Sequence, residues 1–527
     1  MEAQQISFLD IDSIPKLIKD FLQQQVPESE TAFFNLKNVE KSMNEKETYF
    51  SSDKRMLISE VFQKQYAGFT LSEKQQKNID SLQKKQTFTI VTGHQLNLFS
   101  GPVFFVYKIL QTIKTAEFLK EKFPNADFVP VFWMASEDHD FDEINHFRTK
   151  EHFYEFKAQA GGPVGRIEVQ DQFFIHEFEK EFRDTIYGTE LIRWMKEAYT
   201  EGNSLSLAIR TLVQRLFSDY GLLCLDGDDA QLKQLIIPTF QQELVDEKVF
   251  NATKERISYL EKTYGKVQVN PREINLFYLS ETRNRIEKRG SDYFIVDKDL
   301  KFSETEILEE LHQFPEKFSP NALLRPVYQE TVLPNIAYVG GNAEIMYWLE
   351  LTPYFAEIQL PFPILIPRNS MLFLSEKTMS KMDRLDLKLT DFFGNFAQII
   401  HSKLLKDSPI QAELDNQKLK LQSIFDAMKK VSSQTDVTFG NLVSAEETRQ
   451  LKAFDRMQKR LLKAEKIKHQ EKIERIETLF LEIHPGKIWQ ERIFNFSVFY
   501  SDHGAEWLHN CYQNMDVEKS GIIIMTI

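Results

Sequence analysis

The chain has 527 residues, of which 42% are apolar and 27% charged, a composition typical of folded globular proteins and unlike disordered or fibrous chains. Its 78 acidic side chains outnumber the 65 basic ones, and the formal net charge of −13 argues against general nucleic-acid binding. The two cysteines, Cys224 and Cys511, are too few for a disulfide scaffold, and the N-terminus lacks a signal-peptide pattern, so we expect a cytoplasmic protein.

The N-terminal segment, residues 1–86, is polar with short amphipathic stretches, which predicts a helical segment joined to the core. Residues 86–107 carry no charged side chain. Gly93, His94 and Gln95 nevertheless interrupt this stretch with polar and irregular backbone, which the interior of a bilayer does not tolerate. We therefore expect no membrane span here.

A βαβ unit is predicted to begin the core. An apolar strand covers residues 87–91 and a second covers 128–134, with a helix of about 100–121 between them. Ser100 is the expected N-cap of this helix, and Pro102 suits its first turn. Units of this kind build parallel sheets with right-handed crossovers.

The same theme recurs later in the chain. Further apolar strands are expected at 221–225, 336–339 and 364–366. Helical or irregular insertions at about 151–219 and 240–324 separate them. We therefore predict an interrupted, doubly wound α/β core over residues 87–375.

Residues 376–484 are predicted to form a helical coiled-coil arm. Apolar residues recur there at heptad spacing in two groups, with a turn at about 432–439 between them and a second helix of about 444–483, whose seam is interrupted near 468–471. The spaced residues are Leu414, Leu421, Ile424, Met428, Val431, Phe454, Met457, Leu461 and Ala464. Two helices joined by a short turn lie antiparallel. The apolar tail, residues 485–527, is expected to return and pack on the core.

The loop after the first strand is one candidate site. It offers Gly93 for close backbone approach, His94, the amide of Gln95, and the start of a helix at Ser100. Unpaired N–H groups at a helix N-terminus attract phosphate or carboxylate. The alternative is a well-capped loop with a surface histidine.

The loop after the second strand is denser in charge. Residues 136–146 contain five carboxylates and two imidazoles. Such crowding raises the free energy unless a cation compensates, whether a substrate ammonium, Mg²⁺ or an arginine. The alternative is an acidic helix N-terminus that complements the helix dipole. No histidine or cysteine spacing here is typical of zinc.

Polar residues also follow the later strands. Asp226 and Asp228 repeat the acidic strand end, although they equally suit an ordinary turn. Glu344 follows a double glycine and suits either a ligand loop or a first-turn cap. Arg325 and Arg368 flank strands, where a guanidinium binds carboxylate or phosphate, but they equally suit solvent or structural ion pairs.

Several motifs are absent. The chain has no GxxxxGK[ST] loop, no GxGxxG after a strand and no GxSxG elbow, which removes the main sequence support for P-loop, dinucleotide-binding and serine-hydrolase functions. Cys224 lies within an apolar strand and is interpreted as a core thiol.

Taken in order, these blocks resemble the BshC family, the cysteine-adding enzymes of bacillithiol biosynthesis. The matching residues are 92–95 and 100–102 with Lys108, 130–133 leading into 137–146, 225–226 with 228–229, 338–341 with 344–345 and 347–348, 367–370, and 485–486 with 490–492 and Asn495. Many members have Gln where this chain has His94, and their common Gly-Pro-Gly-Glu pattern is Gly-Asn-Ala-Glu at 341–344. The resemblance implies a Rossmann-like core with connecting segments, a coiled-coil arm and a homodimer.

It also implies a reaction, in which the cysteine carboxyl group is joined to the free amine of glucosaminyl-malate. Because amide formation from a free carboxylate is uphill in water, we hypothesise activation by ATP with Mg²⁺. The expected catalytic residues are Glu137, Asp138, His139 and Asp140, which would hold the substrate ammonium and supply the base. The residues expected to bind substrate or nucleotide are Thr92, Gly93, His94, Gln95, Ser100, Gly101, Lys108, Asp226, Asp228, Arg325, Gly340, Gly341, Glu344, Arg368 and Asn369. No residue is assigned to a metal ion.

Two other functions stay open from the sequence. The acidic block could hold divalent ions in a metal-dependent hydrolase or nucleotidyl transferase, or the chain could be a noncatalytic dimeric scaffold. Trp489 and Tyr500 suit either stacking on a nucleotide base or buried packing.

Overall fold

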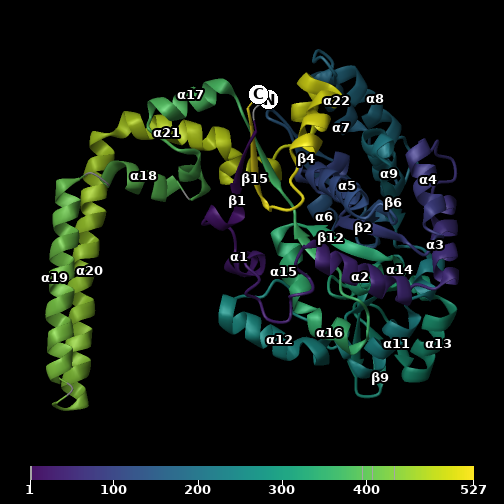
Figure 1. The fold of residues 1–527 in the computed structure, drawn as a ribbon, viewed down its shortest axis with the longest axis horizontal. Coiled ribbons are helices and arrows are strands. Elements are labelled where there is room, and N and C mark those ends of the chain that lie inside the picture. Colours follow the sequence, from purple (N-terminus) through teal and green to yellow (C-terminus); the bar gives the residue numbers. More distant parts are fainter. Residues whose placement is uncertain (1–2, 395, 406–407, 433, 527) are drawn as a thin grey trace. The chain divides into compact units, whose positions relative to one another are not determined.

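The computed structural model describes residues 3–394, 396–405, 408–432 and 434–526 (Figure 1). They divide into two compact units. The first contains the chain up to Asp10, residues 14–373 and residues 490–526. The second contains residues 11–13 and 374–489. The C-terminal segment therefore belongs to the same unit as the sheet.

Five strands form the central sheet of the first unit, in the spatial order β13, β12, β2, β3, β6, and every neighbouring pair is parallel. They are β2 (Thr87–His94), β3 (Asp127–Met134), β6 (Leu223–Asp226), β12 (Asn335–Gly340) and β13 (Ile364–Pro367). Counted along the chain, the order is the Rossmann order 3-2-1-4-5, whose winding reverses between β2 and β12. The predicted fold class is confirmed.

Helix α5 (Phe104–Lys122) connects β2 to β3 and packs on both, while α22 (Ser497–Asn514) packs against α5. Helices α2 (Leu36–Tyr49) and α3 (Ser52–Gln65) pack on the sheet at β12 and β13 and at β6, respectively. The other helices of this part of the unit are α1 (Lys16–Leu22), α4 (Glu73–Ser81), α14 (Leu324–Val332), α15 (Asn342–Glu350) and α16 (Thr352–Glu357).

The first insertion follows β3 and is mainly helical, as expected. Its elements are α6 (Phe141–Ile144), the hairpin of β4 (His146–Arg148) and β5 (Phe153–Glu155), α7 (Phe173–Phe182), α8 (Gly188–Ala198) and α9 (Leu205–Phe217). Phenylalanines fill its core. The ring of Phe178 stacks on Phe182 with centroids 4.4 Å apart and meets Phe99 edge-on at 5.1 Å.

The second insertion differs from the prediction, because its centre is an antiparallel sheet in the order β10, β9, β8, β7, β11. These strands are β7 (Leu276–Leu279), β8 (Arg283–Arg289), β9 (Asp292–Ile295), β10 (Lys301–Ser303) and β11 (Phe318–Pro320). The helices are α10 (Ala230–Gln234), α11 (Ile237–Asp246), α12 (Lys248–Tyr264) and α13 (Glu304–Gln313). Gly290, with φ +67°, helps to close the two-residue turn between β8 and β9.

The two ends of the chain meet in a third sheet. Strand β1 (Ala3–Ser7) pairs antiparallel with β15 (Gly521–Thr526), which lies between β1 and β14 (Ser370–Leu374). The N-terminal segment is therefore not purely helical, in contrast to the prediction. Its first strand contributes to a sheet because an apolar C-terminal strand supplies a partner.

The second unit contains α17 (Glu376–Arg384), α18 (Phe396–Leu405), α19 (Pro409–Ser432), α20 (Val437–Lys468) and α21 (Gln470–Ile483). Helices α19 and α20 form an antiparallel hairpin, which we call the arm. Lys418 pairs with Asp455 at 2.7 Å, and Gln458 donates to Asp415 at 2.7 Å. The second helix starts earlier than expected, at Val437, and ends at Lys468, next to the predicted interruption of the seam.

Within the described residues, no helix combines the length and the apolar character that crossing a membrane requires.

Candidate active site

A cavity of about 740 Å³ lies at the carboxyl ends of β2, β3 and β12, where the winding of the sheet reverses. We call it the crevice. Open α/β sheets bind their ligands at this position. The charged and predicted residues that line it are Gly93, His94, Gln95, Lys108, Glu137, Asp138, Arg272, Arg283, Arg285, Arg325, Gly341, Glu344, Arg368 and Arg492.

Lys108 joins two of the predicted loops. Its buried Nζ donates to the carbonyl oxygen of Gly93 at 2.5 Å and to both carboxylate oxygens of Glu344 at 2.7 and 3.0 Å. Burial lowers the pKa of Lys108, although Glu344 opposes this effect. Lys108 therefore acts first as a brace between β2 and α15, with its side chain at the wall of the crevice.

His94 is held as a neutral ring. Its imidazole packs on the rings of Phe104 and Phe105, with both centroid distances at 5.2 Å, and Nδ1 lies 3.0 Å from the Gln95 carbonyl oxygen. Burial, helped by the nearby Lys108, lowers its pKa to about 4. At neutral pH it therefore brings no positive charge to an anionic ligand.

The predicted N-cap at Ser100 is wrong. Helix α5 begins at Phe104, after a turn in which Ser100 and Gly101 have φ of +70° and +63°. A Cβ at Gly101 would lie 2.6 Å from Asn97 Cβ, so only glycine fits this turn. Neither Ser100 nor Gly101 lines the crevice.

The N-terminus of α5 is also occupied by the protein itself. Val103 N–H donates to the Phe494 carbonyl at 2.8 Å, and Phe105 N–H donates to the Pro102 carbonyl at 3.1 Å. These two donors are therefore already used within the protein and are not free for the predicted phosphate site at this helix end. Thr92 is structural as well, since its hydroxyl donates to the Val339 carbonyl at 2.8 Å.

Glu137 is the acidic residue placed deepest at the end of β3. Its Oε1 lies 2.5 Å from the Nζ of Lys233, which is completely buried on α10. Burial raises the pKa of Glu137 above its usual range, and Asp228 adds to the rise, whereas Lys233 and Arg283 oppose it. Glu137 is thus a crevice carboxylate able to take up a proton.

Asp138 lies beside Glu137 but has the opposite character. It accepts hydrogen bonds from the Gln95 amide at 2.9 Å and from the His139 backbone N–H at 2.8 Å, and Arg283 Nη1 lies 3.5 Å away. Burial alone would raise its pKa, but the His139 side chain, the Gln95 amide, Arg283 and the His139 backbone N–H together hold the pKa below its usual range. Asp138 is therefore a permanent anion.

His139 and Asp140 do not line the crevice. His139 is exposed, with its Nδ1 3.0 Å from Arg283 and its ring against Phe277. Asp140 is also exposed and caps α6 by accepting from Glu143 N–H at 3.3 Å. The cap interpretation holds for Asp140, because the chain turns away from the crevice after Asp138.

No set of three His, Cys, Asp or Glu side chains is grouped to hold a metal ion anywhere in the described part of the chain.

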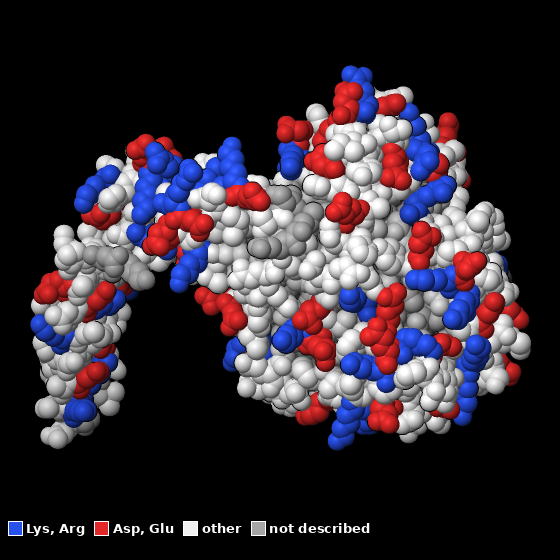
Figure 2. Space-filling view, turned by 45° about the horizontal axis from the view of Figure 1, so that its top comes forward, with Lys and Arg blue, Asp and Glu red and all other residues white. Residues whose placement is uncertain are grey.

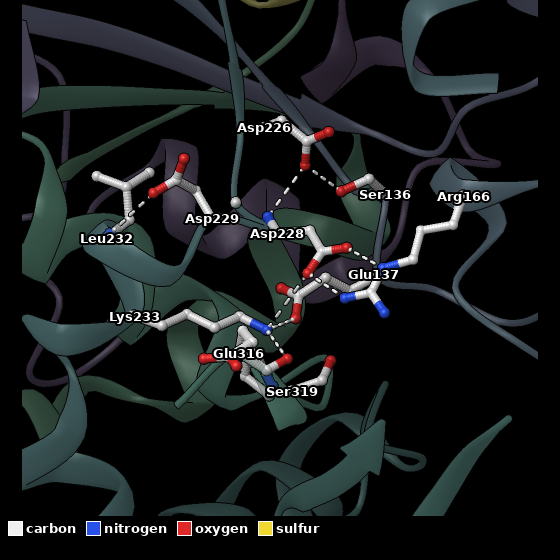
Figure 3. A network of polar contacts seen from close by, with 12 residues as sticks. Ser136, Glu137, Arg166, Asp226, Asp228, Asp229, Leu232, Lys233, Glu316 and Ser319 are labelled. Carbon is white, nitrogen blue, oxygen red and sulfur yellow. Dashed lines mark hydrogen bonds and ion pairs between the residues drawn. The ribbon is translucent and has the colours of Figure 1, made fainter. Parts of the chain in front are cut away.

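The acidic residues after β6 lie outside the crevice lining. Asp226 accepts from the Ser136 hydroxyl and, at 3.0 Å, from Asp228 N–H. Asp228 receives a bidentate pair of hydrogen bonds from Arg166 at 2.7 and 2.8 Å (Figure 3). Both carboxylates are therefore satisfied by the protein, as the turn interpretation predicts.

The double glycine after β12 starts α15. Gly341 N–H donates to Glu344 Oε2 at 2.8 Å in a capping arrangement, and the Tyr338 hydroxyl donates to Oε1 at 2.7 Å. Burial would raise the pKa of Glu344, but Lys108 and these donors lower it to about 2. Gly340 is buried within the strand end and its carbonyl accepts from Arg368 N–H. Glu344 is thus both a cap and an ion-pair partner.

Arg325 and Arg368 differ in their partners. The guanidinium of Arg368 is buried and makes a bidentate pair with Glu491 at 2.7 and 2.9 Å. Arg325 donates to Gln329 at 3.0 Å, but its Nη2 is buried without a hydrogen-bond partner among the described residues. Asn369 is fully buried and ties Gln111, Asp516 and Lys519 together, so its role is structural.

Sequence reasoning missed four arginines of the crevice: Arg272, Arg283, Arg285 and Arg492. Arg283 and Arg285 alternate along β8 and so share one face. Only Ile286 is apolar within residues 283–289, so this strand has no alternating apolar pattern, and the turn at Gly290 is its main local signal. Arg272 lies in an irregular segment that carries no comparable signal.

The crevice is therefore cationic in a chain that is acidic overall. Seven cationic side chains line it, Lys108 and the six arginines, against three carboxylates, those of Glu137, Asp138 and Glu344. On the face drawn in Figure 2, in contrast, basic and acidic side chains are intermingled. The crevice thus favours an anionic ligand while retaining carboxylates that suit an ammonium group.

The two candidate stacking residues lie in different units. Tyr500 is buried against Trp194, with ring centroids 5.0 Å apart, and its hydroxyl donates to Glu190 at 2.9 Å. Trp489 stacks on Phe393 at 5.6 Å and lines a cavity of about 710 Å³ within the second unit. The packing interpretation describes Tyr500.

Comparison with known proteins agrees with this architecture. Residues 1–369 match the family model of the N-terminal Rossmann-like domain of bacillithiol biosynthesis BshC, and residues 371–527 match that of its C-terminal coiled-coil domain. The protein named "Putative cysteine ligase BshC" of Flavobacterium johnsoniae is 39% identical, with 100% of both chains covered. Proteins of the same name are 37% identical in Christiangramia forsetii, covering 100% of this chain and 99% of theirs, and 33% identical in Cytophaga hutchinsonii, covering 98% and 97%. The chain belongs to the BshC family of bacillithiol biosynthesis.

Proposed function

We propose that this protein is a ligase that forms a carbon–nitrogen bond between the carboxyl group of cysteine and the free amine of glucosaminyl-malate. Membership of the BshC family and the names of the relatives support this proposal. The observation that carries it is the crevice itself. Within the described residues, some of its guanidinium groups form no salt bridge, and they share the crevice with two carboxylates, of which one has a raised pKa and the other a lowered pKa.

The cations suit the acidic part of the substrates. Glucosaminyl-malate carries two carboxylates, and planar guanidinium groups bind carboxylates in bidentate fashion. Arg272, Arg325 and Arg492 form no salt bridge with a carboxylate of the described residues. These three arginines are our candidates for holding the anionic groups of the substrates.

The carboxylates suit the amine. An amino sugar is an ammonium ion near neutral pH and must lose a proton before its nitrogen can attack. Asp138, held as an anion, would bind the ammonium group, whereas Glu137, whose pKa is raised, would accept the proton. As the proton moves to Glu137, the nitrogen lone pair would form the bond to the activated carboxyl carbon of cysteine, and the carbon–oxygen bond to the activating group would break, so that this group leaves with the bonding electrons.

The crevice residues also fit a nucleotide phosphate. Among the described residues, the buried Nη2 of Arg325 has no hydrogen-bond partner, and the backbone at Gly93 and Gly341 also lines the crevice. Bound ATP, accompanied by Mg²⁺ on its phosphate oxygens, would supply the activation of the cysteine carboxylate that amide formation requires. Lys108 is already paired with Glu344, so we assign it a bracing role.

Thiol profiling by mass spectrometry in the host, with and without this gene, tests the proposal. Deletion should remove bacillithiol and accumulate glucosaminyl-malate. The wild-type gene should restore the thiol pool and the Glu137→Gln gene should not. An unchanged thiol pool after deletion would reject the cysteine-adding role and favour a metal-dependent hydrolase or transferase.

We also infer that the arm pairs with a second copy of the chain. Several large apolar side chains that the heptad pattern places on its seam are exposed in the single hairpin, notably Ile424 at 52%, Val431 at 65% and Met457 at 44%. A second apolar helix face would cover them. Sedimentation should give a dimer for the wild type and a monomer for Ile424→Lys combined with Val431→Lys. A persistent dimer would reject the arm as the contact.

A further inference from the structure

The proposed proton acceptor is the end of a row of alternating charges. The row runs from Arg166 through Asp228 and Lys233 to Glu137 (Figure 3). Arg166 to Asp228 is a bidentate contact at 2.7 and 2.8 Å, Asp228 to Lys233 spans 3.7 Å, and Lys233 to Glu137 spans 2.5 Å. Only the last member, Glu137, lines the crevice.

The row is most buried at Lys233. The side chain of Arg166 is 48% exposed, that of Asp228 is 9% exposed, that of Lys233 has no exposure, and that of Glu137, at the crevice, is 12% exposed. An ammonium group without solvent must be compensated by neighbouring oxygens. Lys233 finds them in Glu137, in Asp228 and in the Glu316 carbonyl, to which it donates at 3.2 Å.

Backbone contacts fix the loop that carries Glu137. Gly165 N–H donates to the Ser136 carbonyl at 2.8 Å, and Val164 N–H donates to the Asp138 carbonyl at 2.7 Å. A Cβ at position 165 would lie 2.5 Å from Ser136 Cβ, so the approach requires glycine there. Backbone hydrogen bonds thus fix the residues on both sides of Glu137, so the main chain places the Glu137 side chain next to Lys233.

We propose that Lys233 is a positioning residue for the reaction, which holds the Glu137 carboxylate charged and aimed at the crevice so that it can receive the proton of the attacking amine. This inference rests on the proposed function, because the amine is the ligand proposed for the crevice. Lys233 acts through Glu137 and does not line the crevice itself.

The surroundings of Glu137 give the direction of the effect. Its pKa is raised by burial and by Asp228 and lowered by Lys233 and Arg283. Tyr328 also faces this group, and the nearby acidic side chains raise its own pKa. Removing Lys233 therefore takes away the closest stabilising charge and raises the pKa of Glu137 further.

The experiment uses the full-length protein with Lys233→Met, Glu137→Gln and the double variant. The matched control is Lys64→Met, which removes an exposed lysine that pairs with Asp229 at 3.4 Å, outside the row. The rate of cysteine addition is measured with cysteine, glucosaminyl-malate and ATP with Mg²⁺ across the pH range. Thermal unfolding of the same four variants is followed between about pH 5 and 8.

We expect kcat/KM of Lys233→Met to fall at neutral pH by about 10- to 100-fold, and its acidic limb to move to higher pH, so that part of the activity returns as the pH rises. The double variant should be no slower than Glu137→Gln alone, because both changes act on one carboxylate. Lys64→Met should keep the wild-type profile. A uniform loss in Lys233→Met with an unmoved pH profile would overturn the proposal.

The unfolding series tests the positioning role even if cysteine addition is not the reaction. When the pKa of a carboxyl group is higher in the folded than in the unfolded protein, the folded protein loses stability as the pH rises through the folded-state pKa. The destabilisation by Lys233→Met should therefore grow with pH and should become independent of pH in the Glu137→Gln background. Destabilisation that is constant with pH, or unaffected by Glu137→Gln, would overturn the proposal independently of the substrate.

Discussion

The ends of β3 and β6 are neighbours in the sheet and have similar sequences, yet they have different roles. Met134 at the end of β3 pairs with Asp226 at the end of β6, and both strands run into acidic residues. After β3, Glu137 and Asp138 line the crevice, whereas after β6 neither Asp226 nor Asp228 does. Strand β3, the neighbour of β2 on one side of the reversal of winding, thus supplies carboxylates of the site, and the edge strand β6 supplies their support.

The two ends also differ in how their charges are satisfied. Asp228 receives two hydrogen bonds from Arg166, which already compensates its negative charge without a ligand. Glu137 has one close cation, Lys233, and faces a cavity. An acidic residue after a strand is therefore a weak indicator by itself, and its distance from the reversal decides its role.

The largest expected effect separates these two carboxylates directly. Glu137→Gln should lower kcat/KM for cysteine addition by about 10²- to 10⁴-fold, the usual contribution of a general base. Asp228→Asn should lower it by less than about 10-fold, below the range expected for a general base, because Asp228 does not line the crevice. Steady-state kinetics on both variants measures the difference.

The pH profile of Asp228→Asn gives a second check. Because Asp228 raises the pKa of Glu137, its neutralisation should move the acidic limb to lower pH, opposite to the shift expected for Lys233→Met. Equal losses in Asp228→Asn and Glu137→Gln would mean that both strand ends take part in the chemistry, and the contrast between them would fail.

Two arginines extend this comparison between a side chain free to bind a ligand and one paired within the protein. Arg325→Gln removes a crevice donor without a carboxylate partner and should raise KM for an anionic substrate by about 10- to 100-fold, the equivalent of one or two charged hydrogen bonds. Arg368→Gln leaves Glu491 buried and unpaired and should lower the free energy of unfolding by about 3–5 kcal/mol. Kinetics and denaturant unfolding of each variant distinguish the two effects.

The fold could be predicted where the physical signal is local. The parallel strands are runs of apolar residues buried on both faces, and the arm repeats every seven residues, so both are visible in sequence. The Ser100 cap failed because the left-handed backbone at Ser100 and Gly101 delays the helix to Phe104, and a favourable capping residue does not reveal such a turn. Local propensity alone could not exclude it.

The site was predictable only in part, for a related reason. Gly93 at the end of β2, and Gln95 and Glu137 after β2 and β3, were found from the pattern of polar residues at strand ends. Arg272 and Arg492 enter the crevice from segments far away in sequence, and neither lies in a strand of the central sheet. Whether a charge is free or already paired, as for Arg325 and Arg368, depends on partners that only the folded chain brings together.

The two glutamates of the crevice predict opposite responses to acid. Lys108, Tyr338 and Gly341 lower the pKa of Glu344 to about 2, below that of an unfolded carboxyl group. A lowered pKa contributes stability that is present above the unfolded pKa and is lost as the pH falls toward about 2, here up to about 3 kcal/mol. The raised pKa of Glu137 acts in the reverse sense.

Thermal unfolding between about pH 2 and 6 measures this difference. Glu344→Gln should flatten the acid dependence and lower stability at neutral pH, because Lys108 remains buried without its partner. Glu137→Gln should leave the acid loss that is due to Glu344 in place. If the wild type and Glu344→Gln have the same acid dependence, the Lys108 pair does not stabilise the fold.

The smallest expected effects distinguish two residues of the loop after β3, Asp138 and Asp140. Asp138→Asn removes a permanent anion of the crevice and should raise KM for the amine substrate by about 10-fold, with little change in its pH dependence. Asp140→Ala removes only the cap of the four-residue helix α6 and should cost about 0.5–1 kcal/mol of stability, with unchanged kcat/KM. Because Asp138 and Asp140 are two positions apart in the sequence, equal losses of activity would show that the crevice extends past Asp138 along this loop.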